Sequence, residues 1–247
     1  MGLLTMNHPP LLEEPCPALE AGQRALITGA GSGIGKAVAT ALANQGLRVT
    51  LVGRSLGKLQ MTRAHVTVLT ADLATEDGRA LVSERVHPEL HVLVHSAGAY
   101  LRSSITALSV ERWAALDAIN LYAPILLTAA VLPQLRAGRG QVVFINSSAG
   151  LRAGSGLSAY AAGKHGLRAA ADVLRQEVNG YGIRVLSMFL GRTDTPMQQA
   201  ILAEEQRVAP PGTLMQPTEV AEMVLAALRL PRTAEVTDIM MRPMRPL

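Results

Sequence analysis

Tyr160 and Lys164 stand four residues apart in the segment SAYAAGKHG (158–166), separated only by two alanines and a glycine. On a helix, this spacing puts both side chains on one face. A lysine ammonium beside a tyrosine favours the phenolate, so the tyrosine can give or take a proton near neutral pH. The small residues between them would let a cofactor lie against the helix. By itself, the pair is equally compatible with two surface side chains that have no catalytic task.

Two more polar residues fit the same chemistry. Ser147 ends the apolar run GQVVFINS (140–147). Ligands bind where parallel strands end, and a hydroxyl there can hydrogen-bond a substrate carbonyl oxygen. Ser148 is adjacent, but strand alternation points its side chain the other way. Asn120 lies in an apolar helical segment, where its amide is either a satisfied core group or the holder of a water that relays protons to Lys164.

A glycine-rich turn, TGAGSGIGKA (28–37), follows the first apolar run. It is not a P-loop, because Ala37 stands where Ser or Thr is needed. It does not match the plain G-x-G-x-x-G pattern either, because the sixth position counted from its first glycine is an isoleucine. The remaining pattern, Thr-Gly-x-x-x-Gly-x-Gly, allows a tight turn and brings backbone N–H groups at a helix N-terminus close to a pyrophosphate. A turn without a ligand is the alternative. The residues expected to hold a dinucleotide here are Thr28, Gly29, Gly31, Ser32, Gly33, Ile34 and Gly35.

The second apolar run, 48–53, indicates which dinucleotide is bound. An acidic residue at its end would hydrogen-bond the ribose 2′-hydroxyl of NAD, and no acid is present there. Arg54 and Ser55 follow instead, and a guanidinium suits a 2′-phosphate. Lys36, early in the first helix, could reach the same phosphate. This favours NADP(H) over NAD(H), unless Arg54 merely lies at the surface.

The elements that must position these residues alternate along the chain. Continuously apolar strands separated by helical segments predict a parallel sheet covered on both faces. We therefore expect one α/β domain over 23–247, with a doubly wound, Rossmann-like sheet of about seven strands and helices on both faces. Residues 1–22 hold four prolines and are expected to be a loose N-terminal extension. The predicted strands are 24–28, 48–53, 66–70, 91–96, 140–147, 183–190 and 235–241, and the helices are 34–44, 76–86, 110–135, 159–179 and 218–230.

Composition excludes several other classes of protein. The net charge is +4 over 247 residues, but the basic residues are scattered, so we expect no nucleic-acid partner. Cys16 is the single cysteine, which excludes an internal disulfide framework and a cysteine-based metal site. No secretory signal or membrane span is expected. These features predict a cytoplasmic protein without a bound metal.

At this point the motifs resemble a known family. TGAGSGIG, Asn120, Ser147 and the Tyr160/Lys164 pair together resemble short-chain dehydrogenases/reductases of the single-domain type, over residues 23–245. The resemblance implies hydride transfer from a nicotinamide. It implies that Tyr160 is the acid/base, Lys164 holds the nicotinamide ribose and lowers the tyrosine pKa, Ser147 orients the carbonyl, and Asn120 maintains a proton relay.

The same resemblance implies further cofactor contacts after the third, fourth and sixth strands. Two positions depart from the family pattern: His95 replaces an asparagine that makes inter-strand hydrogen bonds, and Leu190 replaces a proline. We expect His95 to support the fold in the same way as the asparagine. The loss of the proline affects the rigidity of the loop. The further contacts are Asp72, Leu73, Ser96, Ala97, Gly98, Gly191, Thr193 and Thr195.

The substrate is expected to meet the loops 148–158 and 192–216. The second loop mixes apolar and charged residues, and a short amphipathic helix there could close over the cofactor. The leading hypothesis is an NADP(H)-dependent reductase of a small apolar carbonyl compound or alcohol. An NADP(H)-binding regulator without turnover, and an epimerase or dehydratase, are the alternatives.

Family members usually form homo-oligomers, so a dimer or tetramer is expected. The helices 110–135 and 159–179 carry apolar residues beyond one face, and these could pair about a two-fold axis. The residues expected at this interface are Leu121, Ile125, Leu167 and Leu174.

Overall fold

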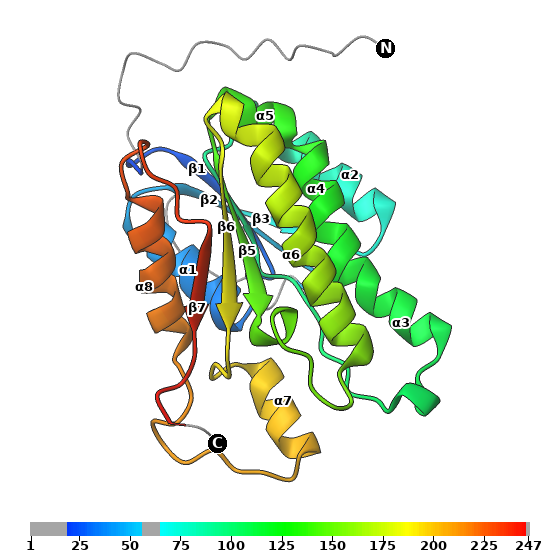
Figure 1. Ribbon diagram of the computed structural model, residues 1–247. Coiled ribbons are helices and arrows are strands. Elements are labelled where there is room, and N and C mark those ends of the chain that lie inside the picture. Colours follow the sequence, from blue (N-terminus) through cyan, green and yellow to red (C-terminus); the bar gives the residue numbers. More distant parts are fainter. Residues whose placement is uncertain (1–18, 56–64, 246–247) are drawn as a thin grey trace.

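A parallel sheet forms the centre of the computed structural model, which describes residues 19–55 and 65–245 (Figure 1). Its strand order is β3-β2-β1-β4-β5-β6-β7, and every neighbouring pair is parallel. The order reverses between β1 and β4, which is where doubly wound sheets bind ligands. The strands are β1 (Arg24–Thr28), β2 (Arg48–Gly53), β3 (Val66–Thr70), β4 (Val92–His95), β5 (Gln141–Ser147), β6 (Arg184–Leu190) and β7 (Asp238–Met241).

Helices cover both faces of this sheet (Figure 1). On one face, α1 (Gly33–Asn44) and α8 (Pro217–Leu228) pack into a core with β1, β2 and β6. On the other face, α2 (Glu76–Arg85), α4 (Ala123–Ala130) and α6 (Ser158–Val178) form a second core. The expected doubly wound α/β fold is thus confirmed.

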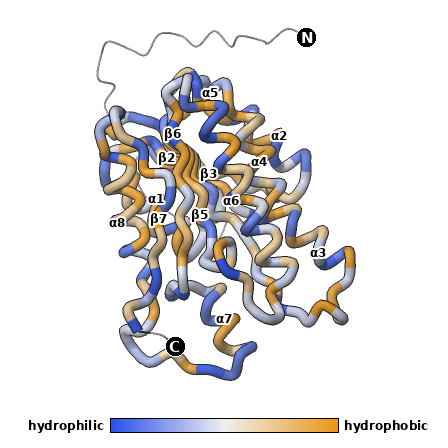
Figure 2. The backbone as a smooth tube through the Cα atoms, in the orientation of Figure 1, coloured by the Kyte–Doolittle hydropathy of each residue, from blue (hydrophilic) through white to orange (hydrophobic). Residues whose placement is uncertain are grey.

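The central strands are apolar because both of their faces are covered, whereas the edge strands β3 and β7 contain no buried residue. Every residue of β6 is buried, and β4 is buried throughout. Figure 2 shows hydrophobic residues concentrated along the central strands. This burial explains why the strands appear in the sequence as continuous apolar runs, without the alternation of a sheet with one solvated face.

The predicted helix 110–135 is interrupted. It consists of α3 (Val110–Asp117), a π-helical turn η3 (Ala118–Tyr122), α4 and α5 (Leu132–Ala137). Proline lies in the first turn of both α4 and α5. The π turn contains Asn120, and π turns within helices are frequent at functional sites.

Length and composition alone would allow the stretch Val110–Ala130 to cross a membrane, contrary to the expectation that no segment would. Only 33% of its most apolar window is buried within the fold. The stretch nevertheless contributes Ala123 and Leu127 to the second core, and both are nearly inaccessible to solvent. A helix packed in a protein core meets the same criterion, so the criterion is weak evidence for a membrane span.

The residues expected at an oligomer interface lie mainly in this second core. Leu167 is only 2% exposed, and Leu121, Ile125 and Leu174 are partly buried against the same cluster. Leu167 is thus already covered by the fold, whereas the other three, on η3, α4 and α6, remain partly accessible. The exposed apolar side chains of the same layer are Tyr122, Leu126 and Val173.

The N-terminal extension is covered by the structure only in part. Residues 1–18 lie outside the described residues. Leu19 packs against the first core, and the N–H of Gly22 donates to the carbonyl of Gly46 at 2.9 Å. The last residues of the predicted extension are therefore attached to the domain.

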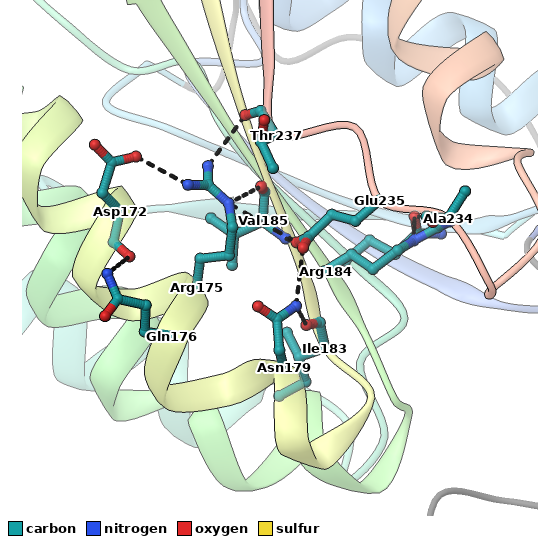
Figure 3. A network of polar contacts seen from close by, with 11 residues as sticks. Asp172, Arg175, Gln176, Asn179, Ile183, Arg184, Val185, Ala234, Glu235 and Thr237 are labelled. Atoms are coloured by element: carbon teal, nitrogen blue, oxygen red, sulfur yellow. Dashed lines mark hydrogen bonds and ion pairs between the residues drawn. The ribbon is translucent and has the colours of Figure 1, made fainter.

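At the amino-terminal edge of the sheet, a network of polar contacts joins α6, β6 and the segment before β7 (Figure 3). Arg184 is 8% exposed and donates to the carbonyls of Leu230, Pro231 and Ala234 at 2.7–3.1 Å. The carboxylate of Glu235 accepts from the N–H of Val185 at 2.7 Å. These bonds fix the amino edge, while the opposite edge is hollowed.

Candidate active site

A cleft of about 1300 Å³ opens at the carboxyl edge of the sheet. The turns after β1 to β6 and the helix α7 (Pro196–Glu204) line it. Figure 1 shows α7 beyond the carboxyl ends of the strands. The cleft brings together all the expected site residues except Thr28 and Gly35. Those that line it are Gly29, Gly31, Ser32, Gly33, Ile34, Arg54, Ser55, Asp72, Leu73, Ser96, Ala97, Gly98, Asn120, Ser147, Tyr160, Lys164, Gly191, Thr193 and Thr195.

The glycine turn has no room for side chains. Gly29 has a φ of +65°, and a Cβ there would lie 2.6 Å from the backbone nitrogen of Ala97. A Cβ on Gly35 would overlap the carbonyl oxygen of Gly29. Thr28 does not line the cleft. Its hydroxyl oxygen accepts from the N–H groups of Ser96 and Ala97, both at 3.1 Å. Thr28 thus joins the turns that follow β1 and β4.

The N-terminus of α1 suits an anion. Ser32 occupies the N-cap without a side-chain capping bond, and the first turn carries no acidic residue. The first N–H groups of this helix therefore lack a side-chain acceptor, and the helix dipole adds partial positive charge. The turn fits the pyrophosphate of a dinucleotide.

The opposite end of the dinucleotide would meet the turns after β2 and β3. Arg54 and Ser55 line the cleft there and are exposed. Asp72 also lines the cleft, with its carboxylate accepting from the N–H of Ala74 at 3.1 Å. Lys36 is exposed and is not among the residues that line the cleft.

Tyr160 and Lys164 project from the first turns of α6 into the cleft. The ammonium of Lys164 lies 5.9 Å from the centre of the Tyr160 ring and donates to the carbonyl of Ile145 at 3.3 Å. Burial raises the pKa of Tyr160, and a hydrogen bond with Ser147 works against this increase. Burial lowers the pKa of Lys164 to about 8. The net direction for the tyrosine is opposite to the one expected from the neighbouring ammonium, because desolvation of the phenolate dominates.

Ser147 is held beside the tyrosine by a residue that sequence reasoning missed. The amide oxygen of Asn146 accepts from the N–H of Ser147 at 2.7 Å, and its nitrogen donates to the carbonyl of Lys164 at 3.1 Å. Asn146 is 3% exposed and so ties the end of β5 to α6. A lone amide in an apolar strand was the available signal. Ser148 is exposed and also lines the cleft, because the strand has already given way to a 3-10 turn (Ser148–Gly150).

Asn120 is buried, and both ends of its side-chain amide are hydrogen-bonded. Its amide nitrogen donates to the carbonyl of Ala99 and its oxygen accepts from the N–H of the same residue, both at 2.9 Å. The side chain is 1% exposed. Each end of the amide therefore has a partner in the loop after β4. Asn120 holds the loop after β4 in place.

His95 supports the fold through a different contact from the one expected. Its Nε2 lies 2.7 Å from the hydroxyl of Thr128 on α4, and its ring stacks on Phe144 with centroids 5.1 Å apart. The Thr128 hydroxyl donates its proton to the carbonyl of Pro124, so His95 must be the donor in their bond. Burial lowers the pKa of His95 to about 3, which keeps the ring neutral.

Sequence reasoning also missed the residues that line the cleft beside Tyr160. The ring of Tyr100 meets that of Tyr160 edge to face, with centroids 5.2 Å apart. Arg102 and Arg192 both pair with Glu205 at the end of α7. The available signal was that Tyr100 and Arg102 follow Gly98 within four residues and that Arg192 directly follows Gly191.

Comparison with known proteins agrees with this geometry. The family model described as short chain dehydrogenase matches residues 23–206. An uncharacterized oxidoreductase of Staphylococcus aureus strain USA300 is 30% identical over 228 residues, which cover 89% of this chain and 96% of that protein.

Two solved structures resemble the whole domain. One is an alcohol dehydrogenase from the archaeon Thermococcus sibiricus complexed with 5-hydroxy-NADP, with a TM-score of 0.81, 25% identity, and coverage of 91% of this chain and 99% of that one. The other is a putative NAD(P) dependent gluconate 5-dehydrogenase from Beutenbergia cavernae with bound NADP. Its TM-score is 0.79, its identity is 28%, and the match covers 91% of this chain and 97% of that one.

Proposed function

The chain belongs to the short-chain dehydrogenase family, and we propose that it is an NADP(H)-dependent oxidoreductase that interconverts a small carbonyl compound and its secondary alcohol. The observation that carries this proposal is the convergence of Ser147, Tyr160 and Lys164 in a cleft that begins at the glycine turn. Nicotinamide, when bound, supplies or accepts the hydride. The protein must hold the carbonyl carbon near it and manage the proton.

In reduction, the Ser147 hydroxyl hydrogen-bonds the carbonyl oxygen and orients it toward Tyr160. Tyr160 then gives its phenolic proton to that oxygen as the hydride reaches the carbonyl carbon. The raised pKa of Tyr160 keeps this proton in place near neutral pH. Oxidation of the alcohol reverses the proton transfer and uses the phenolate.

Lys164 assists both Tyr160 and the cofactor in this scheme. Its ammonium is buried and lies near the Tyr160 ring, so it favours the phenolate that forms during reduction. Its remaining N–H groups would hold the ribose of the nicotinamide. Tyr100, Leu157, Met197 and Ile201 add aromatic and apolar surface for the body of the substrate.

NADP(H) is the proposed cofactor because of the residues after β2. Arg54 lines the cleft where an acidic residue would be needed to bind the 2′-hydroxyl of NAD, and its planar guanidinium suits a 2′-phosphate. Solved relatives at 25% and 28% identity carry 5-hydroxy-NADP and NADP.

The test is a screen of ketones and secondary alcohols, followed at the nicotinamide absorbance with both cofactors, in parent protein and Tyr160→Phe. We expect Tyr160→Phe to keep NADPH binding while turnover falls by about 10²–10⁴, because the ring remains and the proton donor is lost. Tyr122→Phe is the matched control, since Tyr122 is exposed and lies outside the cleft lining. Turnover of Tyr160→Phe at the parent rate would refute the catalytic role of Tyr160. NADPH binding by the parent protein without turnover of any substrate would indicate a regulator instead.

A further inference from the structure

Charged side chains gather beside Tyr100 in the cleft. Arg102, Arg192 and Glu205 line it there. Burial raises the pKa of Tyr100, Glu205 and Glu204 add to this increase, and the two arginines oppose it. With two guanidiniums and two carboxylates acting there, the affinity of the site for an anionic ligand depends on how the guanidiniums are paired.

The single carboxylate is already shared. Oε1 of Glu205 accepts from Arg102 Nη1 at 2.9 Å and from Arg192 Nη2 at 3.0 Å. Oε2 lies 2.8 Å from the same Nη2 of Arg192. Arg192 therefore meets Glu205 through one nitrogen only. Side-chain exposure is 12% for Glu205, 31% for Arg192 and 43% for Arg102, so the carboxylate is the best-shielded member of the cluster.

Two side-chain N–H groups in the cleft lack a hydrogen-bond acceptor within the described part of the chain. Nη1 of Arg192 and Nε2 of Gln198 are buried, and neither has a hydrogen-bond partner among the residues that the structure describes. Gln198 as a whole is 7% exposed and, like Arg192, lines the cleft. Buried N–H groups without acceptors are costly and rare in folded proteins. An acceptor oxygen on a ligand in the cleft would satisfy each of these N–H groups.

We propose that the substrate carries a carboxylate, so that the enzyme interconverts an oxo acid and its hydroxy acid, with Arg192 and Gln198 binding the carboxylate. This inference rests on the proposed function and refines it. A guanidinium edge matches the two oxygens of a carboxylate. A phosphate dianion fits less well, because it would place a second negative charge beside Glu205. Leu157, Met197 and Ile201 contact the apolar part of such a substrate.

The unpaired N–H groups of Arg192 and Gln198 could instead bind the cofactor. Thr195, the N-cap of α7, packs close to the glycine turn: a Cβ on Gly33 would lie 2.9 Å from its methyl group. A test must therefore separate binding of a carboxylate from binding of NADP⁺, and it must do so without relying on turnover.

The test uses titration calorimetry on the full chain saturated with NADP⁺. The probes are straight-chain carboxylates from butanoate to octanoate, each compared with its uncharged primary amide of the same length. We expect at least one carboxylate to bind roughly tenfold or more tightly than its amide, the ratio that one charge-assisted hydrogen bond provides. That preference should shrink as ionic strength rises.

Arg192→Met should abolish the preference for carboxylate over amide while the dissociation constant of NADP⁺ stays near the parent value. Arg85→Met is the matched control, because Arg85 is exposed in the last turn of α2 and outside the cleft lining, and it should keep the preference. Equal binding of acids and amides by the parent protein, or no binding of either, would overturn the proposal. So would an Arg192→Met variant that loses NADP⁺ affinity and keeps the preference.

These outcomes are separate from those of the reductase assay. A protein that reduces neutral ketones but ignores carboxylates keeps the proposed reaction and loses the carboxylate site. A protein that binds carboxylates without any nicotinamide-linked turnover keeps the site and loses the reaction.

Discussion

Two buried titratable groups set the chemistry at the scale of single residues. Burial raises the pKa of Tyr160 and lowers that of Lys164 to about 8. Both shifts have the same cause, since desolvation penalises the charged form of each group. Near neutral pH the tyrosine therefore keeps its proton and the lysine keeps its charge, which is the state that carbonyl reduction requires.

The pH dependence follows from these directions. The rate of reduction, measured as kcat/KM with NADPH, should be flat below pH 8 and fall as Lys164 loses its proton near pH 8. Lys164→Arg should move this limb to higher pH, because a guanidinium stays charged throughout the range. The decrease caused by Tyr160 would then follow at still higher pH, since its pKa is raised. An unmoved limb in Lys164→Arg would show that another group titrates there.

A single residue, Arg54, is expected to determine the preference for NADPH over NADH. The parent should bind NADPH at least about tenfold more tightly than NADH, because each charge-assisted hydrogen bond to the 2′-phosphate contributes roughly 1.5–3 kcal/mol. Arg54→Asp should reverse this order, as measured by fluorescence titration of each reduced cofactor. Arg48→Met serves as the control, since Arg48 is exposed at the amino end of β2 and outside the cleft lining. Equal dissociation constants in the parent would remove the assignment of NADP(H).

The sequence also predicted much of the site. Its motifs place Ser147, Tyr160 and Lys164 in one cleft because each lies at the end of a strand or the start of a helix, where the fold fixes direction. The partners of Asn120 and His95 could not be read in the same way. Those partners, Ala99 and Thr128, depend on packing between distant segments.

At the scale of elements, regular strands were predictable and helix interruptions were not. The β6 strand is buried along its whole length, so its apolar run was unambiguous. The helix predicted over 110–135 contains a π turn at Ala118–Tyr122, and neither periodicity nor composition marks it. Packing of Asn120 against the loop after β4 accompanies this turn, and such a contact is visible only in three dimensions.

The amino edge of the sheet provides a test of element packing. Arg184→Met should destabilise the protein by more than about 3 kcal/mol, because several buried carbonyls lose their donor at once. Chemical denaturation would measure the change. Arg136→Met is the control: this arginine is exposed and stacks on Tyr181, so its loss should cost about 1 kcal/mol or less. Equal losses in the two variants would mean that the Arg184 network contributes little.

At the scale of the whole molecule, the sheet separates two tasks. Its amino edge is fixed by the polar network (Figure 3), and its carboxyl edge opens into the cleft. The cleft lies where the strand order reverses between β1 and β4, so the order of the strands alone places the glycine turn beside the loop after β4. This arrangement was predictable from the alternation of strands and helices.

Assembly is the remaining question at this scale, and we expect a homo-oligomer that pairs through the helices covering the second core. Tyr122, Leu126 and Val173 are 47–53% exposed on that layer, and large apolar side chains at this exposure favour contact with a second copy. Light scattering at micromolar concentration should give at least twice the mass of the 26.1 kDa chain.

A double variant tests whether this face forms the interface. Leu126→Lys with Val173→Lys should lower the mass to that of a monomer, because each lysine would have to be desolvated at the contact. Ile105→Lys is the control, since Ile105 is 74% exposed on the 3-10 turn before α3, outside that layer. A monomeric parent would refute the oligomer itself. An oligomer that survives the double variant would instead move the interface to another face, such as the edge strand β7, where Met240 is 67% exposed.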